Sequence, residues 1–106
     1  MTRVGAVDCG TNTIKLLVAD LDPASGRQDT LARELRIVRL GQDVDRTGRL
    51  ADEALERVFA ACEEYAAIVD SFAVEALRFV ATSAARDAEN SHDFAEGVHA
   101  RLGRSG

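Results

Sequence analysis

The most constraining feature of the sequence is a stretch of helical periodicity between Leu50 and Val69. Asp52 and Glu53 fall in its first turn, where the helix dipole favours negative charge. A helix with one apolar stripe must cover another apolar layer, so we expect it to pack on one face of a sheet. The stripe follows the spacing of an α-helical face and consists of Leu50, Ala54, Leu55, Val58, Phe59, Cys62, Tyr65, Ala66 and Val69.

The segments before this helix have the patterns of strands. Residues 3–8 and 14–20 are short apolar runs, and residues 30–40 form a third segment whose charged positions are typical of an edge strand. We expect 3–8 to be buried on both faces, because its Val and Ala content is nearly continuous. A turn signal at residues 22–26, DPASG, separates the second segment from the third. The three segments therefore predict an antiparallel meander.

The order of all elements predicts the fold class. Residues 77–81 read as a fourth strand, and a helix capped by Thr82 or Ser83 follows, with a break near Asn90. The resulting order, βββαβα, predicts an α/β fold in which a crossover helix makes the fourth strand parallel to the first. Ribonuclease-H-like domains begin in this way. We expect residues 1–106 to form one such domain, truncated at its C-terminal side, with a complete four-stranded domain as the alternative.

Composition narrows the function classes. The chain has 106 residues, 46% of them hydrophobic, and a net charge of −5. This composition excludes intrinsic disorder, and the negative charge argues against binding nucleic acid over the whole surface. No apolar run is long enough to span a membrane and no signal peptide is apparent, so we expect a cytoplasmic protein. Cys9 and Cys62 form no disulfide or metal motif, and we expect Cys9 to be a small loop residue, not a nucleophile.

The first candidate site is the stretch DCGTNTIK at residues 8–15. Gly10 permits close backbone approach and a left-handed φ, and successive backbone N–H groups in such a turn form an anion-binding concavity. A plain hairpin turn is the alternative interpretation. Side-chain donors and one cation add to this predicted phosphate cradle: Thr11, Asn12, Thr13 and Lys15.

Asp8 changes what this loop predicts. A carboxylate beside a bound phosphate repels it by several kcal/mol at low effective dielectric, unless a divalent cation lies between them or the carboxylate orients a water. Mg²⁺ is usually held by one or two carboxylates together with phosphate oxygens. The stretch therefore predicts a magnesium ion as well as a phosphate, with Asp8 as the metal ligand.

The second candidate site is ATSAARDAEN at residues 81–90. Thr82, Ser83 and Arg86 fall at the end of the predicted fourth strand and in the first turn of the next helix, where α/β sheets bind ligands. Arg86 can grip a phosphate with two parallel hydrogen bonds. The alternative is a capped helix whose arginine pairs with its own surface neighbours. If the fourth strand is parallel to the first, both candidate sites lie at one edge of the sheet.

These two stretches resemble a known family. Residues 4–21, VGAVDCGTNTIKLLVADL, and residues 78–90, RFVATSAARDAEN, are similar to the N-terminal part of the exopolyphosphatase/guanosine pentaphosphate phosphohydrolases, the Ppx/GppA phosphatase family. The first motif is shared with sugar kinases, actin and Hsp70 ATPases, whereas the second is far more specific. The resemblance extends over essentially the whole chain and implies the actin-like variant of the ribonuclease-H-like fold.

The resemblance also implies an activity. It is the Mg²⁺- or Mn²⁺-assisted attack of water on the terminal phosphoryl group of inorganic polyphosphate or pppGpp. Asp8 would be the catalytic carboxylate and metal ligand, and Arg86 would stabilise the transferring phosphoryl charge. The phosphate-binding residues implied are Gly10, Thr11, Asn12, Thr13, Lys15, Thr82, Ser83 and Arg86.

Two matters stay open at this point. The general-base glutamate and a second phosphate loop of the family would follow residue 106, so we expect the 106-residue chain alone to be inactive. A non-catalytic phosphate- or nucleotide-sensing module is one alternative, and a sugar kinase or ATPase of the same fold is another, against which the 81–90 motif argues. We expect no nucleic acid or membrane partner, and an unpaired sheet edge leaves a homodimer open.

Overall fold

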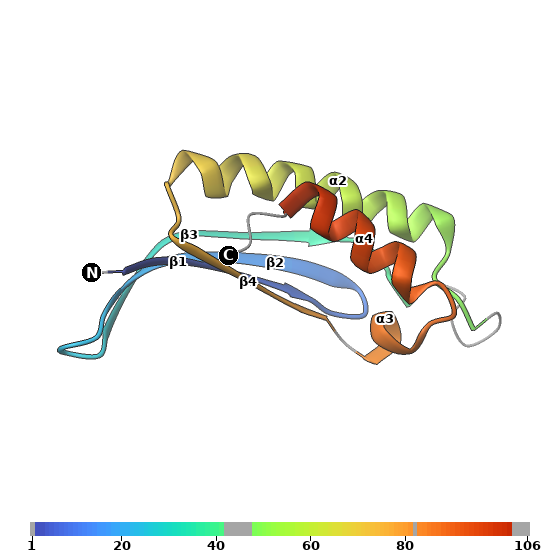
Figure 1. Ribbon diagram of the computed structural model, residues 1–106, viewed down its shortest axis with the longest axis horizontal. Coiled ribbons are helices and arrows are strands. Elements are labelled where there is room, and N and C mark those ends of the chain that lie inside the picture. Colours follow the sequence, from blue (N-terminus) through green and yellow to red (C-terminus); the bar gives the residue numbers. More distant parts are fainter. Residues whose placement is uncertain (1, 42–47, 82, 103–106) are drawn as a thin grey trace.

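The computed structural model describes residues 2–41, 48–81 and 83–102. Its strands and helices follow one another in the predicted order, and the last helical segment is divided into two helices, in agreement with the break predicted near Asn90 (Figure 1). The elements are β1 (Thr2–Cys9), β2 (Thr13–Asp22), β3 (Arg27–Ile37), α2 (Asp52–Ser71), β4 (Ala76–Ala81), α3 (Ser83–Asp87) and α4 (Ser91–Leu102).

The four strands form one sheet in the order β3-β2-β1-β4. β1 pairs with β2, and β2 with β3, in antiparallel fashion, whereas β4 lies parallel to β1 on its other side. This topology confirms the predicted meander with a parallel fourth strand. The register matters for function, because Cys9 at the end of β1 lies beside Ala81 at the end of β4. The segments that follow these two residues therefore leave the sheet side by side.

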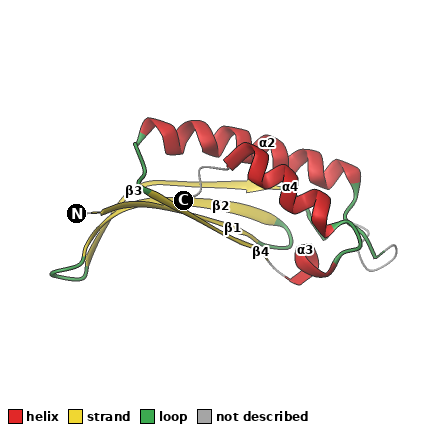
Figure 2. Cartoon of the chain, viewed as in Figure 1, coloured by secondary structure: helices red, strands yellow, loops and turns green. Residues whose placement is uncertain are grey.

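The helices cover one face of the sheet. Figure 2 shows α2 and α4 on the same side, and the core lies between them and the strands. Every second residue of β1 faces this core, so Val7 and Cys9 are fully buried while Val4 and Ala6 are only half-buried. The prediction that 3–8 is buried on both faces is therefore wrong for the described residues. A continuous apolar run predicts two covering layers, but both helices pack on the same side.

Two features hold α2 to the sheet and α4 to α2. The Tyr65 hydroxyl of α2 donates a hydrogen bond of 2.7 Å to the carbonyl of Ile14, the residue opposite Cys9. Helix α4 crosses α2 closely because Gly97 has no side chain, and a Cβ there would lie 2.2 Å from the Phe59 ring. The sheet and both helices thus form one packed unit behind the candidate sites. Among the described residues, no helix has the length and apolar character needed to cross a membrane.

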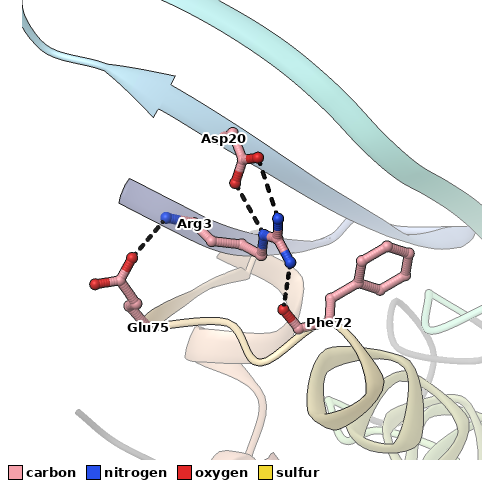
Figure 3. A network of polar contacts seen from close by, with 4 residues as sticks. All are labelled: Arg3, Asp20, Phe72 and Glu75. Carbon is pink, nitrogen blue, oxygen red and sulfur yellow. Dashed lines mark hydrogen bonds and ion pairs between the residues drawn. The ribbon is translucent and has the colours of Figure 1, made fainter. Parts of the chain in front are cut away.

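The start of β1 carries a closed network of polar contacts, which we call the Arg3 network (Figure 3). The Arg3 guanidinium donates from Nε and Nη2 to the two carboxylate oxygens of Asp20, at 2.9 and 3.2 Å, and from Nη1 to the Phe72 carbonyl at 2.9 Å. The Arg3 backbone N–H donates to the Glu75 carboxylate at 2.9 Å. The network thereby ties β1 and β2 to the C-terminal end of α2.

Candidate functional site

The hairpin loop at residues 10–12 joins β1 to β2, and a hydrogen bond of 2.8 Å from the Gly10 N–H to the Thr13 carbonyl closes it. Gly10 does not have the left-handed φ that the sequence allowed, since the positive-φ glycines among the described residues are Gly26 and Gly48. A Cβ at Gly10 would meet only the Thr13 carbonyl, at an ordinary 3.5 Å. The fold of the described chain therefore gives no steric reason for a glycine at this position.

A second segment, residues 38–41, is docked on the hairpin loop. The backbone N–H groups of Val38 and Arg39 donate to the Asn12 carbonyl at 2.8 and 3.0 Å, and that of Gly41 donates to the Thr11 carbonyl at 2.9 Å. These bonds occupy the loop carbonyls. The N–H groups of Thr11 and Asn12 have no acceptor within the ranges that the structure describes. An anion could therefore accept hydrogen bonds from them.

Asp8 and Lys15 lie one step back from the loop. They are directly opposite in the β1–β2 register, and both side chains are exposed. No ion pair joins them. Neighbouring residues of a strand point to opposite faces, and buried Val7 and Cys9 point to the helices, so Asp8 points to the uncovered face of the sheet. This position makes the carboxylate available to a ligand or ion from outside the domain.

Arg86 lies on the short helix α3, and its side chain is exposed. It forms no ion pair with any residue in the described ranges, so the interpretation that it is neutralised by its own helix gains no support there. Thr82 and the side chain of Ser83, also predicted to bind phosphate, lie outside what the structure describes. Figure 1 places α3 at the same end of the molecule as the hairpin loop.

Asn90 fixes the junction between α3 and α4. Its side chain is buried, accepts a hydrogen bond of 2.8 Å from the Leu50 N–H and donates one of 3.0 Å to the Leu50 carbonyl. The Glu89 N–H adds a bond of 2.9 Å to the Gly48 carbonyl. The predicted break near Asn90 is thus confirmed, and its amide holds the helix junction against the segment that precedes α2.

The two candidate stretches begin together but line different cavities. Cys9 and Ala81 are register partners, so the hairpin loop and α3 both start at the same end of the sheet, where β1 and β4 finish. A cavity of about 340 Å³ is lined by Thr11, Asn12, Arg39 and Gly41. Arg86 instead lines a groove of about 650 Å³ between β4 and α4, whose other lining residues include Phe79, Phe94 and Val98.

The groove is larger and most of its lining is apolar, with Arg86 among its few polar residues. The smaller cavity offers hydroxyl, amide and guanidinium donors. Whether one ligand reaches both Asp8 and Arg86 stays a prediction. No described cavity is lined by both residues.

The described residues offer limited ligands for a metal. No group of three or more His, Cys, Asp or Glu side chains among them is arranged to hold an ion. Asp8 supplies a single exposed carboxylate, which fits a Mg²⁺ whose remaining ligands are phosphate oxygens and water, as is usual for this ion. A single exposed carboxylate suits a metal that arrives together with a phosphate ligand, not a closed protein site.

The cysteines are buried and unreactive in this fold. Cys9 is the last residue of β1 and has no exposed surface, so the prediction that it lies in the polar loop is wrong. Burial raises the pKa of the Cys9 thiol to about 12 and that of the Cys62 thiol to about 11. Both thiols are protonated near neutral pH, which argues against a nucleophilic role for either.

The docked segment 38–41 was not predicted as part of the site. The sequence favours the charged face of an edge strand for the arginines at positions 33, 36 and 39, with a basic stripe for a long polyanion as the alternative. In the structure β3 ends at Ile37 and Arg39 reaches the hairpin loop. The sequence does contain a local signal: the charged Arg39 stands between the apolar residues Val38 and Leu40, and a glycine follows. In the structure both apolar neighbours are buried and Arg39 is exposed. Such a pattern indicates a residue held outward by anchored neighbours.

Fold and site together define the class of protein. A three-stranded meander with a parallel fourth strand, and two polar segments at the end of β1 and β4, is the arrangement of the ribonuclease-H-like, actin-like α/β proteins. Comparison with known proteins identifies the family within this class. The model of the Ppx/GppA phosphatase family matches residues 17–105. The chain belongs to the Ppx/GppA phosphatase family.

Individual relatives agree with this assignment. Exopolyphosphatase 2 of Mycobacterium tuberculosis is 51% identical over 96 residues, which cover 89% of this chain and 30% of the relative. The crystal structure of the Ppx/GppA family member from Aquifex aeolicus superposes with a TM-score of 0.89 at 33% identity, covering 98% of this chain and 33% of that one. An exopolyphosphatase from Cytophaga hutchinsonii gives 0.87 at 30% identity, covering 95% and 32%. The chain thus spans about a third of the length of these relatives.

Proposed function

We propose that this chain forms the phosphate-binding wall of a hydrolase that removes the terminal phosphate from inorganic polyphosphate or pppGpp. The observation that carries the proposal is the parallel register of β1 and β4, with Cys9 beside Ala81. It starts both phosphate-type stretches, residues 8–15 and 81–90, from neighbouring strand ends. Two donor-rich segments at one sheet edge are what a polyanion with several phosphate groups requires.

Each of the phosphate-binding residues has a role that follows from its donor groups and charge. The free N–H groups of Thr11 and Asn12 bind phosphate oxygens, and Gly10 leaves room for the ligand to approach the backbone. Thr13 and Lys15 support this cradle with a hydroxyl and a positive charge. The Arg86 guanidinium grips a neighbouring phosphate and stabilises the charge that develops on the transferring group. Thr82 and Ser83 are the remaining proposed phosphate ligands.

Asp8 holds the divalent cation or orients the attacking water in this proposal. Mg²⁺ or Mn²⁺, when bound, would neutralise charge on the phosphate oxygens and remove their repulsion with this carboxylate. Asp8 would be the metal ligand from the described part of this chain. Its exposed position, opposite Lys15 in the register, keeps it accessible from the uncovered sheet face.

We further propose that the 106-residue chain binds polyphosphate without turning it over. Hydrolysis needs a base that activates water as well as groups that bind phosphate. Asp8, the carboxylate that precedes the hairpin loop in the chain, is already assigned in this proposal to the cation or to orienting the water. Steady release of phosphate from polyphosphate by the pure chain with Mg²⁺, abolished by Asp8→Asn, would contradict this expectation.

Binding provides the direct test. Tripolyphosphate affinity is measured by isothermal titration calorimetry with Mg²⁺ at low and high salt, for the wild type, Arg86→Ala and Arg27→Ala. A charge-assisted hydrogen bond contributes about 1.5–3 kcal/mol, so Arg86→Ala should weaken binding by about 10- to 100-fold. Arg27 pairs with Asp29 on β3, and Arg27→Ala removes the same charge outside the site. Equal loss in both variants would indicate general charge attraction and refute the assigned role of Arg86.

A further inference from the structure

Arg39 is a cation in contact with the hairpin loop, because its N–H donates to the Asn12 carbonyl at 3.0 Å, and the proposed function does not use it. Its side chain is exposed and lines the cavity of about 340 Å³ together with Thr11, Asn12 and Gly41. This volume is at the small end of the range for ligand pockets, which suits one compact polar group. The lining combines a hydroxyl, an amide and a guanidinium, with no carboxylate among the four residues.

The backbone holds Arg39 in place from both sides. Val38 and Leu40 have almost no exposed surface, and the Val38 carbonyl accepts a bond of 2.7 Å from the Arg57 Nε–H. The Arg39 N–H is itself bonded to the Asn12 carbonyl at 3.0 Å. Backbone hydrogen bonds therefore hold Arg39 against the hairpin loop, and the guanidinium is not needed for this contact.

The conformation of Arg39 is costly for an arginine. Its φ is 50°, in the left-handed region that L side chains with a Cβ rarely adopt. Such a conformation persists where surrounding contacts impose it, and it is often found at functional sites. A glycine would adopt this backbone without penalty, so local folding does not explain the arginine.

Comparison with Arg36 separates a structural arginine from one available to a ligand. Arg36 forms ion pairs with Glu34 at 3.0 Å and Glu64 at 3.5 Å, and its guanidinium lies over the Tyr65 ring. Arg39, three residues further on, makes no ion pair with a residue of the described ranges. Next to it are the N–H groups of Thr11 and Asn12, which also have no described acceptor. A positive charge beside free N–H donors is the chemistry of an anion subsite.

We propose that Arg39 and the hairpin loop form a binding subsite for one phosphate group of a polyanionic ligand. The subsite rests on the proposed function and adds a residue to it. Arg86 lines a different cavity, so Arg39 would hold a second phosphate group of the same ligand molecule. The subsite would therefore favour ligands with several linked phosphates over orthophosphate.

The test separates phosphate binding from folding by using glycine at position 39. Arg39→Gly removes the guanidinium and relieves the left-handed φ, so its thermal midpoint should equal or exceed that of the wild type. Its tripolyphosphate dissociation constant should rise by about tenfold, the effect expected for one lost charge-assisted contact. The dissociation constant of Arg39→Lys should lie between those of the wild type and Arg39→Gly, because lysine keeps the positive charge but lacks the planar guanidinium fork. Arg27→Ala is the matched control for lost charge.

Amide NMR of the 106-residue chain locates the ligand. Tripolyphosphate should shift the N–H resonances of Thr11, Asn12 and Gly41 in the wild type, and in Arg39→Gly the same shifts should require about tenfold more tripolyphosphate. If the wild type and Arg39→Gly bind equally while Arg86→Ala binds weakly, the Arg39 subsite is refuted and the proposed function stands. If the wild type binds no tripolyphosphate and none of these amides shifts, both are refuted.

Discussion

The two ends of the sheet treat positive charge in opposite ways. At the start of β1, the Arg3 network satisfies the arginine with both Asp20 oxygens and a backbone carbonyl. At the other end, Arg39 and Arg86 make no ion pair with any described residue, although the chain carries a net charge of −5 and acidic side chains are plentiful. Charge that is neutralised within the fold stabilises the fold. Charge left without a partner at one end is available to an external anion.

The comparison extends to the backbone. In the Arg3 network the Glu75 N–H donates to the Arg3 carbonyl at 2.8 Å while the Arg3 N–H donates to the Glu75 carboxylate, so donors and acceptors are matched. In the hairpin loop the carbonyls of Thr11 and Asn12 are satisfied, but their N–H groups have no described acceptor. Substitutions at the first end should therefore change stability alone. Substitutions at the second end should change phosphate affinity as well.

The largest effect should come from Asn90→Ala. It would leave the buried N–H and carbonyl of Leu50 without partners, at about 1–3 kcal/mol for each unsatisfied group. We expect the free energy of unfolding, measured by urea denaturation, to fall by about 2–6 kcal/mol, the sum for the two groups. Gln28 on β3 is exposed, and Gln28→Ala should change stability by less than about 0.5 kcal/mol. If Asn90→Ala were as stable as this control, the amide would not be what holds the α3–α4 junction.

An intermediate effect is expected from Gly41→Ala. A Cβ there would lie 2.5 Å from the Thr11 Cγ2 atom, so the hairpin loop or the docked segment must move. Overpacking of this kind typically costs about 1–3 kcal/mol, and displaced N–H groups should also weaken tripolyphosphate binding. Denaturation and calorimetry of the same variant measure the two losses.

Gly10→Ala should separate the effect on phosphate affinity from the effect on stability, which Gly41→Ala changes together. The new Cβ makes an ordinary contact of 3.5 Å with the Thr13 carbonyl, so stability should change by less than about 0.5 kcal/mol. Affinity should nevertheless fall, if the glycine serves the approach of the ligand. Unchanged affinity in Gly10→Ala would mean that no phosphate reaches the backbone at this position, and the loop would then be a simple turn.

The sequence predicted the architecture well for a physical reason. Helix α2 and the strand order follow from periodicity and chain order, which are local signals, and the parallel register of β4 follows from the crossover helix. The contacts that build the site are long-range. Asn90 bonds to Leu50 across 40 residues, and Arg39 reaches the hairpin loop only because β3 ends at Ile37. No periodicity encodes which backbone groups meet in this way.

Two errors have the same origin. Cys9 was assigned to the loop because polar residues follow it, but strand alternation places it in the core opposite Ile14. The run at 3–8 was expected to be covered on both faces because of its composition, whereas the arrangement of α2 and α4 decides how many faces are covered. Composition predicts which residues can be buried, and tertiary packing determines which ones are.

The smallest effect on phosphate affinity should come from Asp20→Asn in the Arg3 network, which should change stability alone. The hydrogen bond from Arg3 lowers the pKa of the Asp20 carboxyl below its usual value of 3.8. A carboxyl with a lowered pKa in the folded state stabilises the fold above the unfolded pKa, and this contribution is lost as the pH falls through the folded value. The stability difference between wild type and Asp20→Asn should therefore be constant near neutral pH and shrink below about pH 4. Both groups are accessible to solvent, so the difference should also decrease with added salt.

Urea denaturation from pH 7 to pH 3 measures this difference, and calorimetry at pH 7 gives the tripolyphosphate affinity of Asp20→Asn. The affinity should equal that of the wild type, because Asp20 pairs with Arg3 near the start of β1 while the hairpin loop follows its last residue. If Asp20→Asn weakened phosphate binding as much as Arg39→Gly does, the two ends would be coupled through the sheet. The separation between a self-neutralised end and a ligand-binding end would then fail, even with every individual contact in place.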